Sequence, residues 1–230
     1  MTGYFELRRV SLNDYANYQM PGWLRNQIVK LPKTARILDF GCGLGQFVRA
    51  AQASGYELTE GADVEQGALE QCAADGLSVH DLRDPAFFER ARKRFDLVVM
   101  QHVLEHLPKK EAIQIVTRIR ETLRPGGGLL IAVPNAQAFT GPYWAYEDFT
   151  HETLYTSGSL YYVLRAGGFE QVDFLDIHCT EGLSALASGT RYAIWRVYHA
   201  WYQLMGRLLA SPTHRSSPDI FSYEIKAIAR

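Results

Sequence analysis

The stretch Ile37–Phe47, with the sequence ILDFGCGLGQF, decides the fold that we predict for this chain. Residues 35–40 form a short apolar run that ends in glycines, which is typical of a buried strand, and residues 46–53 have the pattern of a helix that begins directly after them. Glycine allows a tight turn and a close approach of the backbone to a ligand, and the helix N-terminus adds free N–H groups. A glycine cluster taken alone is also consistent with a turn that binds nothing.

Strands and helices alternate on both sides of this loop. We predict further strands over residues 57–62, 77–80, 95–100, 129–133, 172–177 and 221–229, and further helices over residues 65–74, 110–123, 159–166 and 183–210. Residues 125–128 (PGGG) predict a turn, residues 221–229 alternate like an edge strand, and residues 135–156 form a long, aromatic, irregular loop. The alternation predicts an α/β fold with a mostly parallel sheet and helices on both faces.

The composition is that of a single globular domain. The chain has 230 residues, with 24 Lys and Arg against 25 Asp and Glu, and a formal net charge of −1. This balance gives no basic field that would gather nucleic acid, so we expect no nucleic-acid partner. The three cysteines match neither a disulfide framework nor a zinc site, and they favour the cytoplasm. The first ten residues lack the apolar segment of a signal peptide, and no run is apolar for long enough to predict a membrane-spanning helix.

An acidic residue after the second predicted strand narrows the choice of ligand. Asp63 lies 18 residues after Gly45, where a carboxylate accepts hydrogen bonds from a ribose diol. The dinucleotide fingerprint G-x-G-x-x-G would need glycine at position 46, where this chain has Gln46. Asp39, beside the loop, favours a ligand with an amino group over a pyrophosphate, which a carboxylate repels.

Five segments, in this order, resemble the class I S-adenosylmethionine-dependent methyltransferases: ILDFGCGLGQF, GADVEQGAL, HDLRD, FDLVVMQHVLEHLP and LRPGGGLLIAVPN. They cover about residues 35–135 and are similar to the subgroup that carries a V-L-E-H-L signature after the fourth strand. The resemblance implies S-adenosylmethionine as cofactor. It also implies a Rossmann-like fold with a seven-stranded, mostly parallel sheet, an antiparallel last strand and a C-terminal helical insertion.

We accordingly predict a single methyltransferase domain over residues 1–230. Its parts are an N-terminal cap segment (1–34), a cofactor-binding core (35–135), a substrate loop (136–157) and a helical insertion (183–218).

The resemblance also implies which residues contact each part of the cofactor. The methionine part would contact Asp39 and, through the backbone, Gly41, Cys42 and Gly43. The ribose would contact Asp63, and the adenine would contact Val64, Asp81 and Leu82. The sulfonium would lie near Gln101 and His102. The set is completed by Tyr18, which would close over the methionine end, and by Gly45 and Gln46.

Methyl transfer to a hydroxyl needs an acceptor oxygen in line with the sulfonium and a base that removes its proton. Histidine suits this task near neutral pH. We predict His151 as the base, because it lies in a dense polar and aromatic part of the loop that should cover the acceptor. The nearby acids Glu147, Asp148 or Glu152 would orient its ring.

Three other histidines compete with His151. His102 and His106 lie just past the fourth strand, at the sheet edge where ligands bind in this kind of fold, and they are the other catalytic candidates. His80 ends the third strand, on the adenine side. A hydrogen-bonded structural role is the alternative for each of them.

The acceptor is suggested by the segment around His151. The pattern DFTHE, followed by Tyr-Thr, Ser-Leu and Gly-Gly-Phe, resembles methyltransferases of bacterial cell-surface polysaccharide biosynthesis. This resemblance implies a sugar hydroxyl of a surface glycan or its precursor, with Tyr143, Trp144 and Tyr146 as stacking faces. The sequence shows no compact metal-ligand spacing, so we predict no metal site. The alternatives are a small-molecule (quinone or secondary-metabolite) O- or N-methyltransferase and a non-catalytic cofactor-binding subunit.

Residues 193–210 (AIWRVYHAWYQLMGRLLA) predict an amphipathic helix without any acidic residue. A wide apolar face with Trp and Tyr beside a thin basic stripe is typical of a helix on a membrane surface, a substrate cap or a homodimer contact, and also of a helix packed within the fold. We therefore expect a cytoplasmic protein, peripheral to the inner membrane if lipid contact is the role of this helix.

Overall fold

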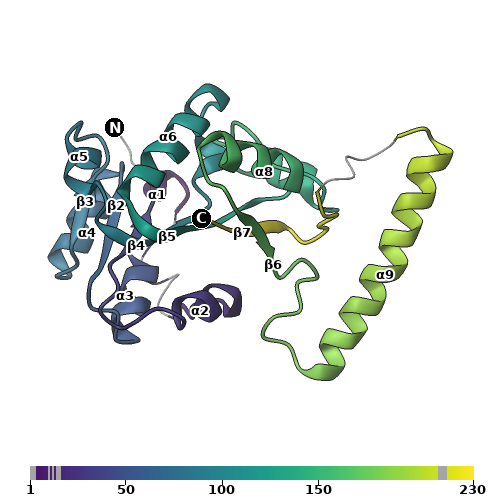
Figure 1. Cartoon of the computed structure of the whole chain (residues 1–230), viewed down its shortest axis with the longest axis horizontal. Coiled ribbons are helices and arrows are strands. Elements are labelled where there is room, and N and C mark those ends of the chain that lie inside the picture. Colours follow the sequence, from purple (N-terminus) through teal and green to yellow (C-terminus); the bar gives the residue numbers. More distant parts are fainter. Residues whose placement is uncertain (1–3, 10, 12, 14–16, 212–216) are drawn as a thin grey trace.

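A computed structural model describes residues 4–9, 11, 13, 17–211 and 217–230 of the chain (Figure 1). Its strands are β1 (Ile37–Phe40), β2 (Thr59–Asp63), β3 (Val79–Asp81), β4 (Phe95–Gln101), β5 (Leu123–Pro134), β6 (Val172–Leu175) and β7 (Glu224–Ala229). Its helices are α1 (Tyr4–Leu7), α2 (Gly22–Ile28), α3 (Gln46–Ala53), α4 (Gln66–Ala74), α5 (Phe87–Ala91), the 3-10 turn η2 (Leu104–His106), α6 (Lys109–Thr122), α7 (Gly141–Glu147), α8 (Ser157–Ala166) and α9 (Ala185–Leu208).

The seven strands form one sheet in the order β3-β2-β1-β4-β5-β7-β6. Neighbouring strands are parallel except β7, which is antiparallel to both β5 and β6. This topology confirms the predicted Rossmann-like fold with an antiparallel last strand. The chain order reverses between β1 and β4, and a crevice for a ligand forms outside the carboxyl ends of the strands at such a point.

Both faces of the sheet are covered by helices (Figure 1). Val98 and Met100 of β4 belong to the apolar core under α5, α6 and α8, whereas Leu97 and Val99 pack with α2 and α3 on the opposite face. A strand covered on both sides needs apolar side chains at successive positions, which explains the continuous apolar run of β4. This construction leaves the carboxyl edge of the sheet as the place where polar side chains can gather.

Three sequence predictions were wrong in detail. The predicted edge strand β7 lies inside the sheet, because its alternating polar residue Lys226 is buried and forms ion pairs with Asp176 and Glu224. The predicted turn at residues 125–128 lies within β5, which pairs with β4 through a shift in register. The long loop after β5 contains α7, which the irregular aromatic pattern concealed.

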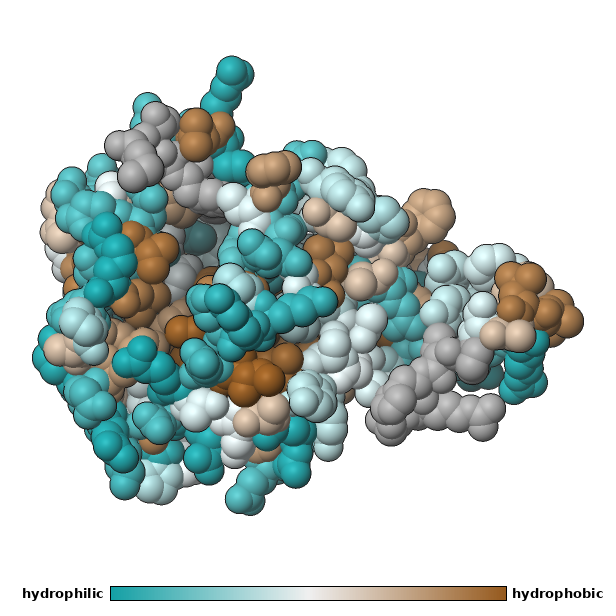
Figure 2. Space-filling view, turned by 90° about the horizontal axis from the view of Figure 1, so that it is seen from above, coloured by the Kyte–Doolittle hydropathy of each residue, from teal (hydrophilic) through white to brown (hydrophobic). Residues whose placement is uncertain are grey.

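Helix α9 is inserted between β6 and β7 and extends away from the body of the protein (Figure 1). None of its residues is buried, so α9 packs against the rest of the fold along one side only. Its aromatic side contacts Phe221, whose ring lies 4.8 Å from Tyr198 and 5.1 Å from Tyr202. The opposite side exposes apolar residues, among them Leu208 and Leu209, and Figure 2 shows apolar side chains at the far end of this helix. Within the described ranges, no helix has the length and apolar character needed to cross a bilayer.

Candidate active site

The glycine loop after β1 depends on backbone conformations that suit glycine. Gly41, Gly43 and Gly45 have φ values of 83°, 49° and 77°. A Cβ atom at Gly41 would lie 2.2 Å from Cγ2 of Val103, and one at Gly43 would lie 2.9 Å from the Phe5 ring of α1. The loop is therefore covered by the N-terminal segment on one side and by the end of β4 on the other. Cys42 is buried in this loop, and its contact with a ligand stays a prediction.

Asp63, at the end of β2, organises this loop. One oxygen of its carboxylate accepts the backbone N–H of Gly43 at 2.7 Å, and the other accepts the N–H groups of Val64 and Glu65 at 2.7 and 2.9 Å. A carboxylate has about four lone-pair sites, so these three bonds leave room for one hydroxyl donor such as that of a ribose. Asp63 is thus a positioning group for the glycine loop as well as the predicted ribose ligand.

The methionine end of the predicted site holds buried polar atoms without partners. The hydroxyl of Tyr18 and the Oε1 atom of Gln46 have no hydrogen-bond partner among the described residues. Burial and the nearby charge of Asp39 raise the pKa of Tyr18 above its usual range. Burial, with repulsion from Asp63 and Cys72, raises the pKa of Asp39 to about 8. Buried polar atoms without partners are uncommon, and these fit a zwitterionic amino-acid group whose ammonium would meet Asp39.

The adenine side of the predicted site is more open. The side chain of Val64 is 58% exposed, so it can cover one face of a base. Leu82 packs against the core and donates its N–H to the Asp63 carbonyl at 2.9 Å. Asp81 forms a bidentate ion pair with Arg83, which holds the pKa of the Asp81 carboxyl below its usual range. An exocyclic amine would have to share Asp81 with this guanidinium.

His102 is held as a cation, which speaks against its predicted role as base. Its Nε2 atom lies 3.1 Å from Glu224 and its Nδ1 atom 3.4 Å from Glu105. Burial works to lower the pKa of His102, but the two carboxylates outweigh it and raise the pKa to about 10. A histidine that is already protonated at neutral pH cannot accept a proton from a substrate.

His106 and His151, which the sequence analysis treats as rival candidates, come together at the carboxyl edge. Their ring centroids are 4.8 Å apart. The segment after α7 is tied to η2 because Glu152 and Thr153 donate their backbone N–H groups to the carbonyl of Glu105, at 2.8 and 3.2 Å. These bonds bring a histidine from the substrate loop beside a histidine that follows β4.

The predicted orientation of His151 by an acid was wrong. Its Nδ1 atom is 2.7 Å from the carbonyl oxygen of Trp144, which can only accept. The proton of a neutral ring therefore lies on Nδ1, and the lone pair on Nε2. Asp148 instead accepts the Thr150 hydroxyl at 2.6 Å, and Thr150 in turn contacts Nδ1 of His106 at 2.8 Å.

His80 has a structural role. Its Nε2 atom lies 2.7 Å from Glu60, which also binds Arg94 at 2.7 Å. This network lies between β2 and the start of β4, away from the other three histidines.

The comparisons with known proteins agree with this geometry. A family model described as "Methyltransferase domain" matches residues 12–173. The chain belongs to this methyltransferase family. A curated relative, N-terminal Xaa-Pro-Lys N-methyltransferase 2 of Danio rerio, is 30% identical over 101 residues, which are 41% of this chain and 36% of the relative. The chain thus matches only about a third of that relative's length.

Solved structures share the fold at low identity. A SAM-dependent methyltransferase from Archaeoglobus fulgidus superposes with a TM-score of 0.66 at 19% identity, over 98% of this chain and 97% of the other. Phosphoethanolamine N-methyltransferase 2 of Haemonchus contortus, solved with S-adenosyl-L-methionine, gives a TM-score of 0.54 at 17% identity, over 93% of this chain and 54% of the other. With the family match, these likenesses confirm an enzyme with a methyltransferase fold and S-adenosylmethionine as its cofactor.

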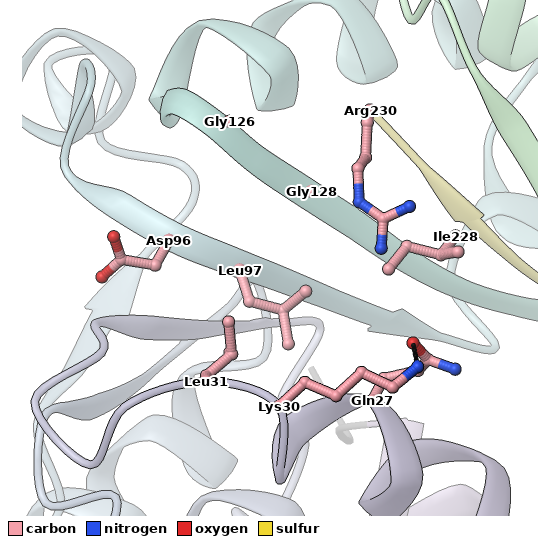
Figure 3. Close-up of a pocket in the computed structure, with 9 residues that line it drawn as sticks. All are labelled: Gln27, Lys30, Leu31, Asp96, Leu97, Gly126, Gly128, Ile228 and Arg230. Atoms are coloured by element: carbon pink, nitrogen blue, oxygen red, sulfur yellow. Dashed lines mark hydrogen bonds between the residues drawn. The ribbon is translucent and has the colours of Figure 1, made fainter.

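A small pocket of the methyltransferase lies at the other edge of the sheet (Figure 3). It has a volume of about 80 Å³ and is lined by residues at the start of β4 and β5, the end of β7 and the end of α2, among them Lys30, Asp96 and Arg230. The amino edge of a parallel sheet is not where ligands bind in this fold. None of the predicted site residues lines this pocket.

Two residues of the candidate site escaped the sequence analysis. Glu224 begins β7 and reaches His102 across the sheet, and no local pattern announces this contact. Glu105 was visible as part of the V-L-E-H-L signature, but its burial was not. It is 0% exposed, and both of its carboxylate oxygens lack hydrogen-bond partners among the described residues.

Proposed function

We propose that this methyltransferase transfers a methyl group to a sugar hydroxyl of a bacterial surface glycan or its precursor, and that His151 takes up the hydroxyl proton. The observation that carries the proposal is the bond between Nδ1 of His151 and the carbonyl of Trp144, at 2.7 Å. It fixes the tautomer in which Nε2 can accept a proton. S-adenosylmethionine supplies an activated methyl group when bound, so the protein has to hold the acceptor and remove its proton.

The substrate loop supplies surfaces that suit a ring-shaped acceptor. Tyr146 is 85% exposed and Phe149 is 100% exposed, while Tyr143 packs edge-on against Trp144 at 5.2 Å. Exposed aromatic rings gathered on one loop of a soluble domain are typical of a binding surface, and they offer flat apolar faces with a polar rim. This supports a saccharide or another cyclic, hydroxylated acceptor.

The test compares His151→Gln with the wild type on a panel of nucleotide sugars and oligosaccharides, with S-adenosylhomocysteine release as the readout. A general base contributes roughly 10²–10⁴-fold, so kcat should fall by that factor while S-adenosylmethionine binding stays unchanged. His199→Gln, on α9, is the matched control and should keep full turnover. Equal turnover in His151→Gln and wild type on a confirmed sugar acceptor would remove His151 from the mechanism.

A second candidate is N-methylation of a small molecule. The curated relative named above supports transfer to nitrogen, although its name gives an Xaa-Pro-Lys N-terminus and not a small molecule as the acceptor. A neutral amine attacks without prior loss of a proton, so this activity would survive His151→Gln. Turnover on amines but not on hydroxylated acceptors would decide for this reading.

For α9 we propose contact with an anionic membrane surface, where a lipid-linked acceptor would lie. At 100° per residue, Ile194, Val197 and Leu208 share one exposed face of this helix, and they are 65%, 72% and 67% exposed. Arg196 and Arg207 lie at one border of this face, and Arg191, whose guanidinium donates to the Cys179 carbonyl at 2.6 Å, lies at the other. Apolar residues bordered by cations on both sides are typical of an interfacial helix whose basic side chains extend to the headgroups.

Vesicle sedimentation tests this contact. The full chain should sediment with phosphatidylglycerol vesicles, less with phosphatidylcholine vesicles, and Val197→Asp should abolish the binding. A dimer on size exclusion with no vesicle binding would instead assign the face to a second copy of the chain.

A further inference from the structure

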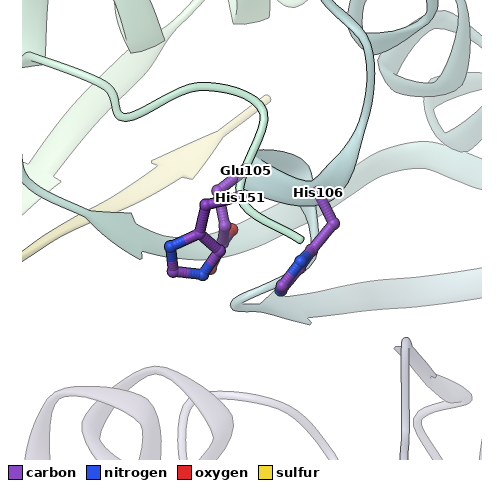
Figure 4. Close-up of side chains that lie close together, drawn as sticks. All are labelled: Glu105, His106 and His151. Atoms are coloured by element: carbon purple, nitrogen blue, oxygen red, sulfur yellow. The ribbon is translucent and has the colours of Figure 1, made fainter. Parts of the chain in front are cut away.

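Glu105, His106 and His151 come together from two segments of the chain (Figure 4). One ligand atom from each lies within 4.8 Å of the others. Glu105 and His106 belong to η2, directly after β4, and His151 belongs to the loop after α7. The backbone bonds from Glu152 and Thr153 to the Glu105 carbonyl fix these segments against each other, so the grouping does not depend on the side chains alone.

The carboxylate of Glu105 is the unusual member of this group. It is fully buried, and neither oxygen has a hydrogen-bond partner among the described residues. A buried carboxylate is expensive unless it is paired and hydrogen-bonded, and such a group is normally explained by a counter-ion, a water or a ligand. His102 places one positive charge 3.4 Å from Oε1, but Glu224 shares that charge from the other side.

Hydrogen bonds at Nδ1 set the tautomers of the two histidines. The Trp144 carbonyl fixes the proton of His151 on Nδ1. The Thr150 hydroxyl donates to Asp148 at 2.6 Å, so its oxygen accepts from Nδ1 of His106. In both neutral rings the lone pair is therefore on Nε2. Metal-binding histidines characteristically donate their other ring N–H to a carbonyl or to a group backed by a carboxylate, and both arrangements are found here.

We propose that Glu105, His106 and His151 bind one divalent transition-metal ion. Two imidazoles and one carboxylate form a donor set that suits Zn²⁺, Mn²⁺ or Fe²⁺ and leaves coordination positions open. Metal–ligand bonds of about 2.1 Å place ligand atoms roughly 3.0–3.4 Å apart, so ligand atoms that lie within 4.8 Å of one another must approach by up to about 1.8 Å on binding. This departs from the sequence analysis, which found no compact ligand spacing, because the fold rather than the spacing brings His151 to the pair.

The site would serve the proposed hydroxyl acceptor, and to this extent the inference rests on the proposed function. An ion with open positions lowers the pKa of a bound hydroxyl. Its binding also engages the lone pair of His151. In the ion-loaded enzyme the acceptor hydroxyl would then lose its proton to solvent. In the ion-free enzyme it would lose its proton to His151.

The test is metal binding to the full chain after treatment with a chelator, in the absence of cofactor and acceptor. Calorimetric titration with Zn²⁺ and Mn²⁺ and the absorption of bound Co²⁺ are the readouts. Wild type should bind one ion per chain, and Glu105→Gln should weaken binding at least tenfold. Thr150→Val, which removes the group that sets the His106 tautomer, should weaken it about 10–100-fold.

His199→Gln is the control for adventitious binding by a surface histidine and should bind as wild type does. If circular dichroism shows that Glu105→Gln is unfolded, His106→Gln takes its place. Absence of binding, or equal binding by wild type and the folded ligand variants, would overturn the metal site. Because neither cofactor nor acceptor is present, that failure would leave the proposed O-methylation untouched, and failure of O-methylation would leave the metal result standing.

Discussion

Cofactor binding by this methyltransferase should weaken as the pH falls, because of Asp39. This carboxyl is 4% exposed at the end of β1, and burial, Asp63 and Cys72 raise its pKa to about 8. A raised carboxyl pKa means that Asp39 is mostly protonated and neutral below pH 8 in the free enzyme. The ammonium of S-adenosylmethionine needs the charged form, so binding at lower pH must first remove a proton.

The size of the effect follows from the pKa. If the paired carboxylate has its ordinary pKa near 4, the apparent Kd scales with the ratio of total to ionised Asp39 and rises about 75-fold from pH 7.5 to pH 5.5. An α-amino group with a pKa of about 7.7–8.0 is more than half charged at pH 7.5 and fully charged at pH 5.5, so its own titration offsets this rise by less than about twofold. Calorimetry at pH 6.5 in two buffers of different ionisation enthalpy should detect the release of close to one proton per cofactor bound.

Asp39→Asn separates the contribution of this carboxyl from that of any other group that titrates in this pH range. The variant should bind S-adenosylmethionine weakly, with an affinity that changes little between pH 5.5 and pH 7.5. The reasoning fails if wild type shows a flat profile, or if Asp39→Asn keeps the same slope as wild type.

Three stability predictions follow from other contacts. Gly41→Ala should lower the free energy of unfolding in urea by about 2–5 kcal/mol, because φ is 83° and the new Cβ would lie 2.2 Å from Val103. Adding Val103→Ala in the same chain should recover part of the loss, and no recovery would contradict the steric cause. Lys226→Ala should lower the free energy of unfolding by about 3–5 kcal/mol, because it removes the cation 3.1 Å from the buried carboxylate of Asp176. A loss below about 1 kcal/mol would show that water solvates this ion pair. For Glu60, burial acts to raise the pKa, but its bonds to a histidine and an arginine lower it. Its stabilisation is therefore present above its ordinary pKa and is lost as the pH falls through the lowered one. Glu60→Gln should cost about 1–2 kcal/mol at pH 7 and less at acidic pH, and an equal loss at both would exclude an ionic origin.

Much of the fold could be predicted because its signals are local. Each signal comes from one short segment and has one structural cause. Examples are the glycine loop, the apolar run of β4 and the acid at the end of β2. The position of β7 could not be predicted in this way, because Lys226 alternates with apolar residues like a solvent-facing side chain. Only the tertiary ion pairs with Asp176 and Glu224 make its burial tolerable.

In the candidate site, too, only the parts that depend on local sequence could be predicted. Its predicted cofactor half follows one strand–loop–helix unit and the strand beside it, so motif spacing is enough to propose its residues. The acceptor half is assembled by long-range contacts, such as the bonds that hold the loop of His151 to the Glu105 carbonyl. The tautomer of His151 depends on a backbone carbonyl, which has no sequence signature. Electrostatic partners like Glu224, more than a hundred residues from His102, are invisible to any local pattern.

The place of α9 in the topology has a consequence for how this protein can be changed. Since β6 and β7 are adjacent antiparallel strands, a short turn would be enough to connect them, and the long excursion between them is not required to close the sheet. The glycine loop and the acid of β2 lie in the other half of the sheet, away from that connection. The predicted cofactor site and α9 are thus separable parts of the chain. The residues between β6 and β7 could be exchanged for those of another protein while the half of the sheet with the glycine loop stays intact.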